Sequence, residues 1–394
     1  MREGWRWYGP LDVITLAQVA QTGARAIVTA LHDIPYGEVW DRTAIAARRD
    51  MIARAGPGMD WAVVESLPVH ERIKRGDGDL SQLFANYRQS MANLAAEGIR
   101  VICYNFMPLI DWTRTDLTAP APGGGTALRF DQTALCMLDV CMLNRDGAAD
   151  DFTADILNRA RARHDAATDD QRAALIAAVM AGLPGAYDRY DLPALRAALR
   201  GYAGIDAAAL RANYGRFLDQ VVPTAAELGL RLCVHPDDPP KDILGLPRIV
   251  SDADDIGWIM ARRPEPENGL TLCSGSLGAN PANDVPAIAR RFADRIHFAH
   301  LRNVTRDPDG SFQEAAHLDG DTDMAELVAA LLQEEARRRK AGRDDAAITF
   351  RPDHGHELLT DAGAGAHPGY PLIGRMRGLA ELRGVIAGLT HARA

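Results

Sequence analysis

Four side chains that can bind a metal ion are spaced through the second half of the chain: His235, Cys273, His300 and Asp353. Each lies at or just after the end of a short apolar run of the kind that forms a β-strand. Two imidazoles, a thiolate and a carboxylate suit a divalent transition metal with open positions for substrate oxygens. The soft thiolate favours Zn²⁺ or Fe²⁺ over Mg²⁺, and Mn²⁺ is also compatible. A histidine or cysteine at a strand end is, taken alone, more often structural, so the prediction rests on the four residues together.

A second group of residues could move protons. His354 lies in the sequence RPDHGH (Arg351–His356), and an imidazole exchanges protons near neutral pH. Arg351 could hold a carboxylate through two parallel hydrogen bonds, and Tyr370 could act as a phenolic acid or base. The alternative for RPDHGH is a turn of exposed polar groups, and Tyr370 could equally belong to the core.

Polar residues also follow the apolar runs in the first half of the chain. The longest such segment is Cys103–Asp116, in which Asn105 could orient a substrate hydroxyl. His32, Glu65–Ser66 and His70 follow earlier runs. Packed loops with salt bridges would have the same composition, so this group supports a site only in combination with the others.

Eight such runs alternate with helical patterns, and this alternation predicts a parallel β-sheet. Eight strands are the number in a closed (β/α)₈ TIM barrel, which we predict as the fold, with a doubly wound open sheet as the alternative. The C-terminal strand ends of a barrel share one rim, so the four candidate ligands would converge there. His297 and His300 would point to opposite sides of one strand, and we assign His300 to the inside because it is nearer the strand end. The predicted strands are Trp5–Tyr8, Ala26–Ala30, Trp61–Glu65, Val101–Asn105, Arg231–His235, Gly269–Cys273, Ile296–Leu301 and Ala347–Phe350.

We treat residues 1–394 as a single barrel domain that contains an insertion at about 107–203. Met107–Asn144 is irregular apart from a possible strand at Ala127–Asp131, and Arg145–Ala203 is rich in Ala, Arg and Asp and helical in pattern. We expect this insertion to cap the barrel mouth or to form a subunit contact.

Composition and charge narrow the classes of function. The 394 residues include 44 Lys and Arg against 53 Asp and Glu, a net charge of −9 that argues against a nucleic-acid partner. No apolar stretch reaches the ~20 residues of a membrane span, and the N-terminus has no apolar signal core. The five cysteines lack paired zinc-ribbon spacing and fit a reducing compartment. We therefore expect a cytoplasmic protein with no membrane partner.

The chain resembles the mannonate dehydratase family, which belongs to the xylose-isomerase-like barrels. The resemblance extends over nearly the whole chain and is most specific in CYNFMPLIDWTRTDL (Cys103–Leu117) and RPDHGH (Arg351–His356). It implies a TIM barrel that dehydrates D-mannonate to 2-keto-3-deoxy-D-gluconate, with Mn²⁺ as the usual metal. It also assigns the metal ligands and the acid/base pair, which are His235, Cys273, His300 and Asp353 for the metal, and His354 with Tyr370 for proton transfer.

For this reaction we expect His354 and Tyr370 to share two tasks, removal of the C2 proton and protonation of the departing C3 hydroxyl. The sequence does not assign which residue does which. Arg302, Arg351 and Asn105 are expected to hold oxygens of the sugar acid. Fe²⁺ or another divalent transition metal is the alternative to Mn²⁺, and a homodimer is the expected assembly. The alternative function is a sugar isomerase or epimerase on the same metal-binding barrel, acting on neutral sugars.

Overall fold

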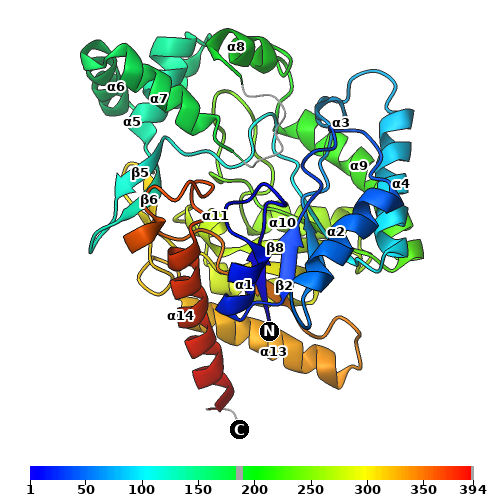
Figure 1. The fold of residues 1–394 in the computed structure, drawn as a ribbon. Helices are drawn as coiled ribbons and strands as arrows, with labels where there is room; N and C mark the ends of the chain where they lie inside the picture. Colours follow the sequence, from blue (N-terminus) through cyan, green and yellow to red (C-terminus); the bar gives the residue numbers. More distant parts are fainter. Residues whose placement is uncertain (183–189, 392–394) are drawn as a thin grey trace.

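The computed structural model describes residues 1–182 and 190–391. Eight parallel strands close into a barrel in the order β1-β12-β9-β8-β7-β4-β3-β2, with helices around it (Figure 1). Because β1 pairs with both β2 and β12, the sheet is closed, which confirms the predicted barrel and excludes the open sheet. The barrel strands are β1 Arg2–Arg6, β2 Ala26–Thr29, β3 Asp60–Glu65, β4 Val101–Tyr104, β7 Arg231–Val234, β8 Asn268–Cys273, β9 Ile296–His300 and β12 Thr349–Arg351.

The strands read as continuous apolar runs because the barrel buries both faces of its sheet. Inside the barrel a separate cluster of fully buried side chains forms the floor under the rim. Its members are Val28, Val63, Cys103, Cys233 and Phe298. The opposite faces of the strands pack against the surrounding helices in one large apolar core.

The predicted bounds of the first strand are wrong. We predicted Trp5–Tyr8, whereas pairing begins at Arg2, opposite Thr349, and β1 ends at Arg6. Tyr8 has left the sheet, because its amide donates a hydrogen bond to the carboxylate of Asp12. Its ring consequently lies at the barrel rim.

Helices follow the strands and cover the outside of the barrel (Figure 1). The helix after β12 begins at Leu372, as the sequence pattern predicted. The long helix before β7 begins at Ala207, earlier than its apolar pattern indicated, with Asp206 as N-cap. The helices around the barrel are α1 Leu16–Thr22, α2 Arg42–Ala55, α3 Glu71–Arg75, α4 Ser81–Ala96, α9 Ala207–Leu228, α10 Ala253–Arg262, α11 Ser274–Gly278, α12 Val285–Arg291, α13 Met324–Lys340 and α14 Leu372–His391.

The chain between β4 and α9 lies outside the barrel sheet. It contributes two strands to a small second sheet, and one of them, β6, was predicted. The other two strands of this sheet follow β9, and the strand order is β10-β11-β6-β5. Its helices have their own apolar cluster, which includes Leu138, Ile156 and Leu195. Residues 183–189, within the predicted helical stretch, lie outside the described residues. The elements are β5 Asp116–Pro120, β6 Thr126–Phe130, α5 Gln132–Cys136, a π-helix at Met137–Leu143, α6 Ala154–Ala166, α7 Asp169–Val179 and α8 Leu192–Arg200, with β10 Val304–Arg306 and β11 Phe312–Glu314.

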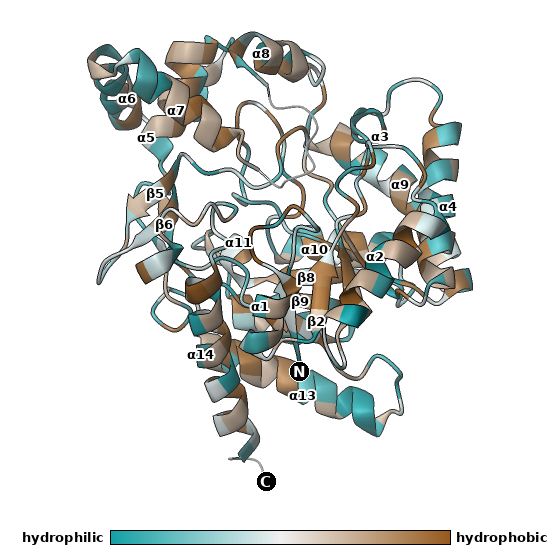
Figure 2. Ribbon diagram, in the orientation of Figure 1, coloured by the Kyte–Doolittle hydropathy of each residue, from teal (hydrophilic) through white to brown (hydrophobic). Residues whose placement is uncertain are grey.

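Apolar residues concentrate on the central strands, and the exposed part of α13 is hydrophilic (Figure 2). Among the described residues, no helix is both long enough and apolar enough to cross a bilayer. The buried strands form a rigid support below the rim of the barrel, where polar side chains from several strand ends can meet.

Candidate active site

Three of the predicted metal ligands meet at the C-terminal ends of neighbouring strands. Cys273 and His300 are the last residues of β8 and β9 and are paired in register, and His235 directly follows β7. One ligand atom from each of the three lies within 4.8 Å of the others. His235 Nε2 and His300 Nδ1 lie 3.1 Å apart.

The other nitrogen of each imidazole lies near an acceptor oxygen. His235 Nδ1 lies 2.6 Å from the carbonyl oxygen of Pro236, so Nδ1 carries the hydrogen and Nε2 keeps its lone pair. His300 Nε2 lies 3.4 Å from Glu65 Oε1. Histidines that bind metals are typically oriented in this way, by a carbonyl or carboxylate on the far nitrogen. Burial lowers the pKa of His235, which keeps its ring neutral.

Asp353 adjoins this cluster from the segment after β12. Its Oδ2 lies 3.8 Å from both Cys273 Sγ and His300 Nδ1. Burial opposes its charge, but Arg351, His354, His300 and Arg302 outweigh burial and hold the pKa of Asp353 well below its usual range. Two imidazole nitrogens, a thiol sulfur and an ionised carboxylate therefore face one small volume, and this donor set fits a divalent transition metal.

His297 lies on the outer side of β9. Its Nε2 is 2.9 Å from the carbonyl oxygen of Pro266, in the segment before β8. The strand alternation therefore directs His300 into the barrel and His297 away from it, as expected.

The two residues expected to transfer protons lie side by side. The rings of His354 and Tyr370 are 5.0 Å apart and nearly perpendicular. His354 Nδ1 is 2.9 Å from Glu314 Oε1, and the Tyr370 hydroxyl donates to Asp353 Oδ1 at 3.2 Å. Burial, followed by the nearby Tyr8 and Asp353, raises the pKa of Tyr370 well above its ordinary value. Tyr370 is therefore a protonated phenol at neutral pH.

The two predicted substrate-binding arginines already contact carboxylates. Arg351 bonds Glu65 through Nε and Nη2, at 3.0 and 2.6 Å, and also contacts Asp353. The two parallel hydrogen bonds expected for a substrate carboxylate therefore go to Glu65 in this structure. Arg302 donates to Asp238 Oδ2 at 2.9 Å and lies 3.4 Å from Asp353 Oδ2.

Three charged residues of the site were not among the predicted site residues. Arg114 forms a bidentate pair with Asp238, at 2.8 and 3.0 Å, and donates to Glu314 Oε1 at 2.8 Å. Burial opposes the charge of Glu314, but Arg302, His354 and Arg114 outweigh it and lower its pKa to about 2. Glu314 lies on β11, a strand of only three residues that no periodicity could reveal. Arg114 did lie in the polar segment Cys103–Asp116, which follows β4.

Many of these groups, though not Cys273, His300, Arg114 or Glu314, line one cavity, whose empty volume is about 310 Å³ including space open to solvent. Asn105 reaches it from the end of β4, with its amide donating to Asp111 Oδ2 at 3.0 Å. His235 and Asp353 of the candidate metal cluster line the cavity together with the histidine–tyrosine pair, an arrangement that can polarise a substrate and move protons on it. Its lining residues are Glu65, Asn105, Met107, Asp111, Trp112, His235, Asp238, Arg302, Arg351, Asp353, His354 and Tyr370.

Comparisons with known proteins agree with this geometry. The chain matches the family model described as D-mannonate dehydratase (UxuA) over residues 1–394. It is 54% identical to a mannonate dehydratase of Chromohalobacter salexigens, over 98% of each protein. It is 49% identical to one of Rhizobium meliloti, over 100% of this chain and 98% of that protein.

A crystal structure of mannonate dehydratase from Streptococcus suis serotype 2 matches with a TM-score of 0.78 and 32% identity, covering 100% of this chain and 94% of that one. A xylose isomerase domain protein from Alicyclobacillus acidocaldarius, 13% identical with a TM-score of 0.52, shares the fold over 99% of both chains. The resemblance seen in the sequence is thus confirmed over the full length, and the chain belongs to the D-mannonate dehydratase (UxuA) family.

Proposed function

We propose that this protein dehydrates D-mannonate to 2-keto-3-deoxy-D-gluconate and water. The observation that carries the proposal is that His235 and Asp353, two members of the nitrogen, sulfur and carboxylate cluster, line the same cavity as His354 and Tyr370. Relatives named mannonate dehydratase, 47–54% identical over at least 98% of this chain, support the substrate.

We propose Mn²⁺ as the metal, with Fe²⁺ or another divalent transition metal as the alternative. His235, Cys273, His300 and Asp353 would hold it, because their donor atoms face one another and the far nitrogens of both histidines already have acceptors nearby. When bound, the metal supplies positive charge that makes the C2 proton of a sugar acid easier to remove.

We assign His354 as the base that removes the C2 proton. Glu314 is ionised and can only accept a hydrogen bond, so the hydrogen of the neutral ring lies on Nδ1 and the lone pair on Nε2. Nε2 is therefore the atom of His354 that receives the proton. Glu314 is a positioning residue, since it fixes the ring without lining the cavity.

We assign Tyr370 as the acid at C3. Its hydroxyl already donates a hydrogen bond to Asp353, so its proton is present at the cavity wall. As the C2–H bond breaks, its electron pair forms the C2–C3 double bond, and the C3 hydroxyl leaves as water with the Tyr370 proton. The enol product tautomerises to the 2-keto acid, and a proton passing from His354 to Tyr370 through solvent restores the starting state. Asn105 and Arg302, both in the cavity wall, are proposed to hold substrate hydroxyl or carboxylate oxygens.

We also propose a compartment and an assembly for this protein. The five cysteines are all free thiols, which supports a reducing, cytoplasmic compartment. Leu11 and Leu359, in the segments after β1 and β12, are 96% and 84% exposed, and we propose that a second copy of the chain covers them in a homodimer. Light scattering of the purified protein measures the assembly directly.

An activity assay tests the proposed function against the isomerase alternative. Purified apoprotein is incubated with Mn²⁺, Fe²⁺, Zn²⁺ or Mg²⁺ and with D-mannonate, D-mannose or D-xylulose, and 2-keto-3-deoxy acid and isomerised sugar are both measured. We expect keto-acid formation from D-mannonate alone, highest with Mn²⁺. Conversion of the neutral sugars without keto-acid formation from D-mannonate would favour the isomerase or epimerase.

A further inference from the structure

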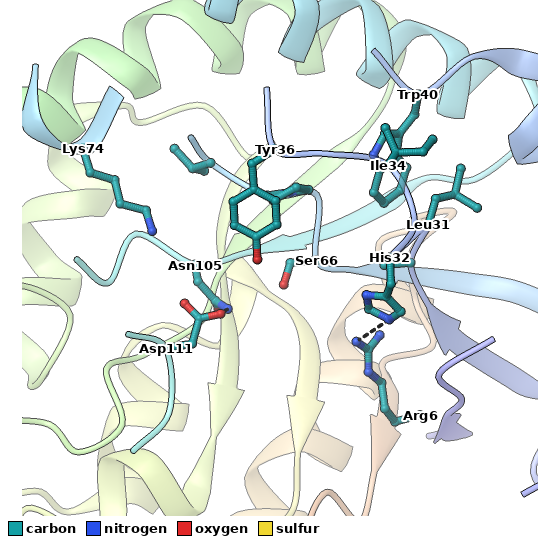
Figure 3. A pocket seen from close by; sticks show the side chains of 13 residues that line it. Arg6, Leu31, His32, Ile34, Tyr36, Trp40, Ser66, Lys74, Asn105 and Asp111 are labelled. Atoms are coloured by element: carbon teal, nitrogen blue, oxygen red, sulfur yellow. Dashed lines mark hydrogen bonds between the residues drawn. The ribbon is translucent and has the colours of Figure 1, made fainter. Parts of the chain in front are cut away.

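Two buried histidines lie next to the active site and have no part in the proposed chemistry. His317, in the turn after β11, is 4% exposed, and His356, the second histidine of RPDHGH, is 8% exposed. Neither lines the catalytic cavity, and neither lines the neighbouring pocket at the ends of β1–β4 (Figure 3). A substrate held in these spaces does not touch either ring, so any contribution of the two histidines to the reaction passes through other residues.

His317 holds the backbone directly before Asp353. Its Nε2 lies 2.7 Å from the carbonyl oxygen of Pro352, and a carbonyl oxygen only accepts, so Nε2 carries the hydrogen and donates it. The turn that contains His317 is itself tied to the end of β9, because the Asn303 amide donates to the carbonyl oxygen of His317 at 3.1 Å. His317 thus links the strand end that carries His300 to the one that carries Asp353.

The backbone of Asp353 is in a conformation that needs support. Its φ of 62° lies in the left-handed region, where the Cβ atom crowds the backbone and which residues other than glycine seldom adopt. Such a conformation persists where the surrounding structure holds it. A hydrogen bond holds the chain on each side of Asp353. The bond before it comes from His317, and in the bond after it the Gly355 amide donates to the carbonyl oxygen of Gly369 at 2.9 Å.

His356 makes a similar contact with Glu314. Its Nε2 lies 3.0 Å from the main-chain carbonyl oxygen of Glu314, whose carboxylate is 2.9 Å from His354 Nδ1. Glu314 is the last residue of β11, a strand of only three residues. His356 therefore fixes the main chain of the residue that orients the His354 ring.

Helix α14 packs closely against both histidines. A Cβ atom at Gly378 would overlap the ring of His317, and a Cβ atom at Gly374, one turn earlier, would overlap the carbonyl oxygen of His356. Glycine at these two positions lets the helix approach to this distance. The ring of His317 and the main chain of His356 are therefore confined in the positions from which they act.

We propose that His317 and His356 are positioning residues of the active site. His317 keeps the Asp353 carboxylate in the metal cluster, and His356 keeps the Glu314 carboxylate on His354. Each acts through a hydrogen bond from Nε2 to a main-chain carbonyl oxygen. This inference rests on the proposed metal-dependent dehydration and adds to it two residues that hold its machinery in place.

Amide variants test the hydrogen bond of His317. The amide nitrogen of glutamine is as many bonds from the main chain as Nε2 of histidine, and that of asparagine is one bond nearer. His317→Gln can therefore donate to Pro352, whereas His317→Asn does not reach it. In apoprotein titrated with Mn²⁺ by calorimetry, we expect His317→Asn to raise the Kd of Mn²⁺ by about 10–100-fold, as is typical when a residue that orients a metal ligand is lost. His317→Gln should stay near the wild-type Kd.

His297 provides a matched control. It too is buried, and its Nε2 lies 2.9 Å from a proline carbonyl oxygen, but on the outer side of β9 and away from the site. His297→Asn removes a comparable hydrogen bond and should leave the Kd of Mn²⁺ unchanged. Thermal melts of both asparagine variants measure the stability that each one loses, so a loss of metal affinity is separated from a general loss of stability.

The effect of His356 should appear in turnover instead of metal binding. His356→Asn should lower kcat for D-mannonate by about 10–100-fold, because the His354 ring loses its alignment, and should leave the Kd of Mn²⁺ unchanged. His356→Gln should keep the wild-type kcat. In a Glu314→Gln background, His356→Asn should have little further effect, because His356 acts through the Glu314 carboxylate.

Three results would overturn the proposal while leaving the dehydratase intact. The first is a wild-type Kd for Mn²⁺ in His317→Asn, and the second is an equal rise of this Kd in His317→Gln. The third is an undiminished effect of His356→Asn in the Glu314→Gln background. Absence of D-mannonate turnover by the wild type with every metal would instead refute the proposed function, and the Mn²⁺ titrations would still decide the role of His317.

Discussion

Replacing His354 with asparagine separates proton transfer from metal binding. Asparagine can still donate a hydrogen bond to Glu314 Oε1, now 2.9 Å from His354 Nδ1, but it has no nitrogen lone pair that can receive the C2 proton. A positioned general base contributes about 10²–10⁴ in rate, or ~3–5 kcal/mol of barrier at 1.36 kcal/mol per tenfold. We therefore expect kcat to fall by at least about a hundredfold.

The same variant should keep its metal. His354 Nε2 lies 3.9 Å from Asp353 Oδ1, and no atom of His354 belongs to the cluster of His235, Cys273 and His300. Metal content by mass spectrometry and keto-acid formation are measured on the same sample, with His164→Asn on α6 as a control that leaves both unchanged. A His354→Asn enzyme with more than a tenth of the wild-type kcat, or one that has lost its metal, would show that the assignment of His354 as base is wrong.

Four other predictions follow from the structure. Cys273→Ser should lower bound metal at least about tenfold, because the hydroxyl of serine is a poor substitute for a thiolate, and equal metal content by mass spectrometry would exclude Cys273 as a ligand. Arg351→Lys should lower the free energy of unfolding by about 3 kcal/mol in denaturant titrations, because lysine cannot form the buried bidentate pair with Glu65, and a change below about 1 kcal/mol would contradict this. Asp361 accepts the amide hydrogens of Leu372, Ile373 and Gly374 at 3.1, 3.0 and 2.9 Å, so Asp361→Ala should cost about 1–2 kcal/mol of stability. Asp361→Ala should also lower kcat more than it changes KM, because Tyr370 directly precedes that helix start, and a pure KM effect would argue against this. Burial, partly offset by Asp309, lowers the pKa of Lys241 from 10.5 to about 8, so the unfolded chain binds the extra proton between these values and stability should rise with pH across that window. Lys241→Met should flatten this part of the pH–stability curve, and an unchanged slope would refute the shift.

The barrel was predictable because its information is local. Each parallel strand is buried on both faces, so runs such as Val101–Tyr104 stand out from the helices between them, and their number indicated closure. The family resemblance rested on short polar segments at the strand ends, and the comparisons confirm it over the whole chain. The bounds of β1 were wrong because pairing with Thr349, a residue far along the chain, sets where that strand begins.

For the candidate site, the sequence by itself determined which side chains stand at the strand ends, because the rim of a barrel is fixed by strand order. A metal site formed by His235, Cys273, His300 and Asp353 could therefore be predicted from the sequence. Only the tertiary structure decided which charges are paired, because ion pairs between residues far apart in sequence depend on how loops fold over the rim. It paired Arg351 with Glu65, whereas the sequence predicted that Arg351 holds oxygens of the substrate. It also brought Glu314 from a three-residue strand to the ring of His354.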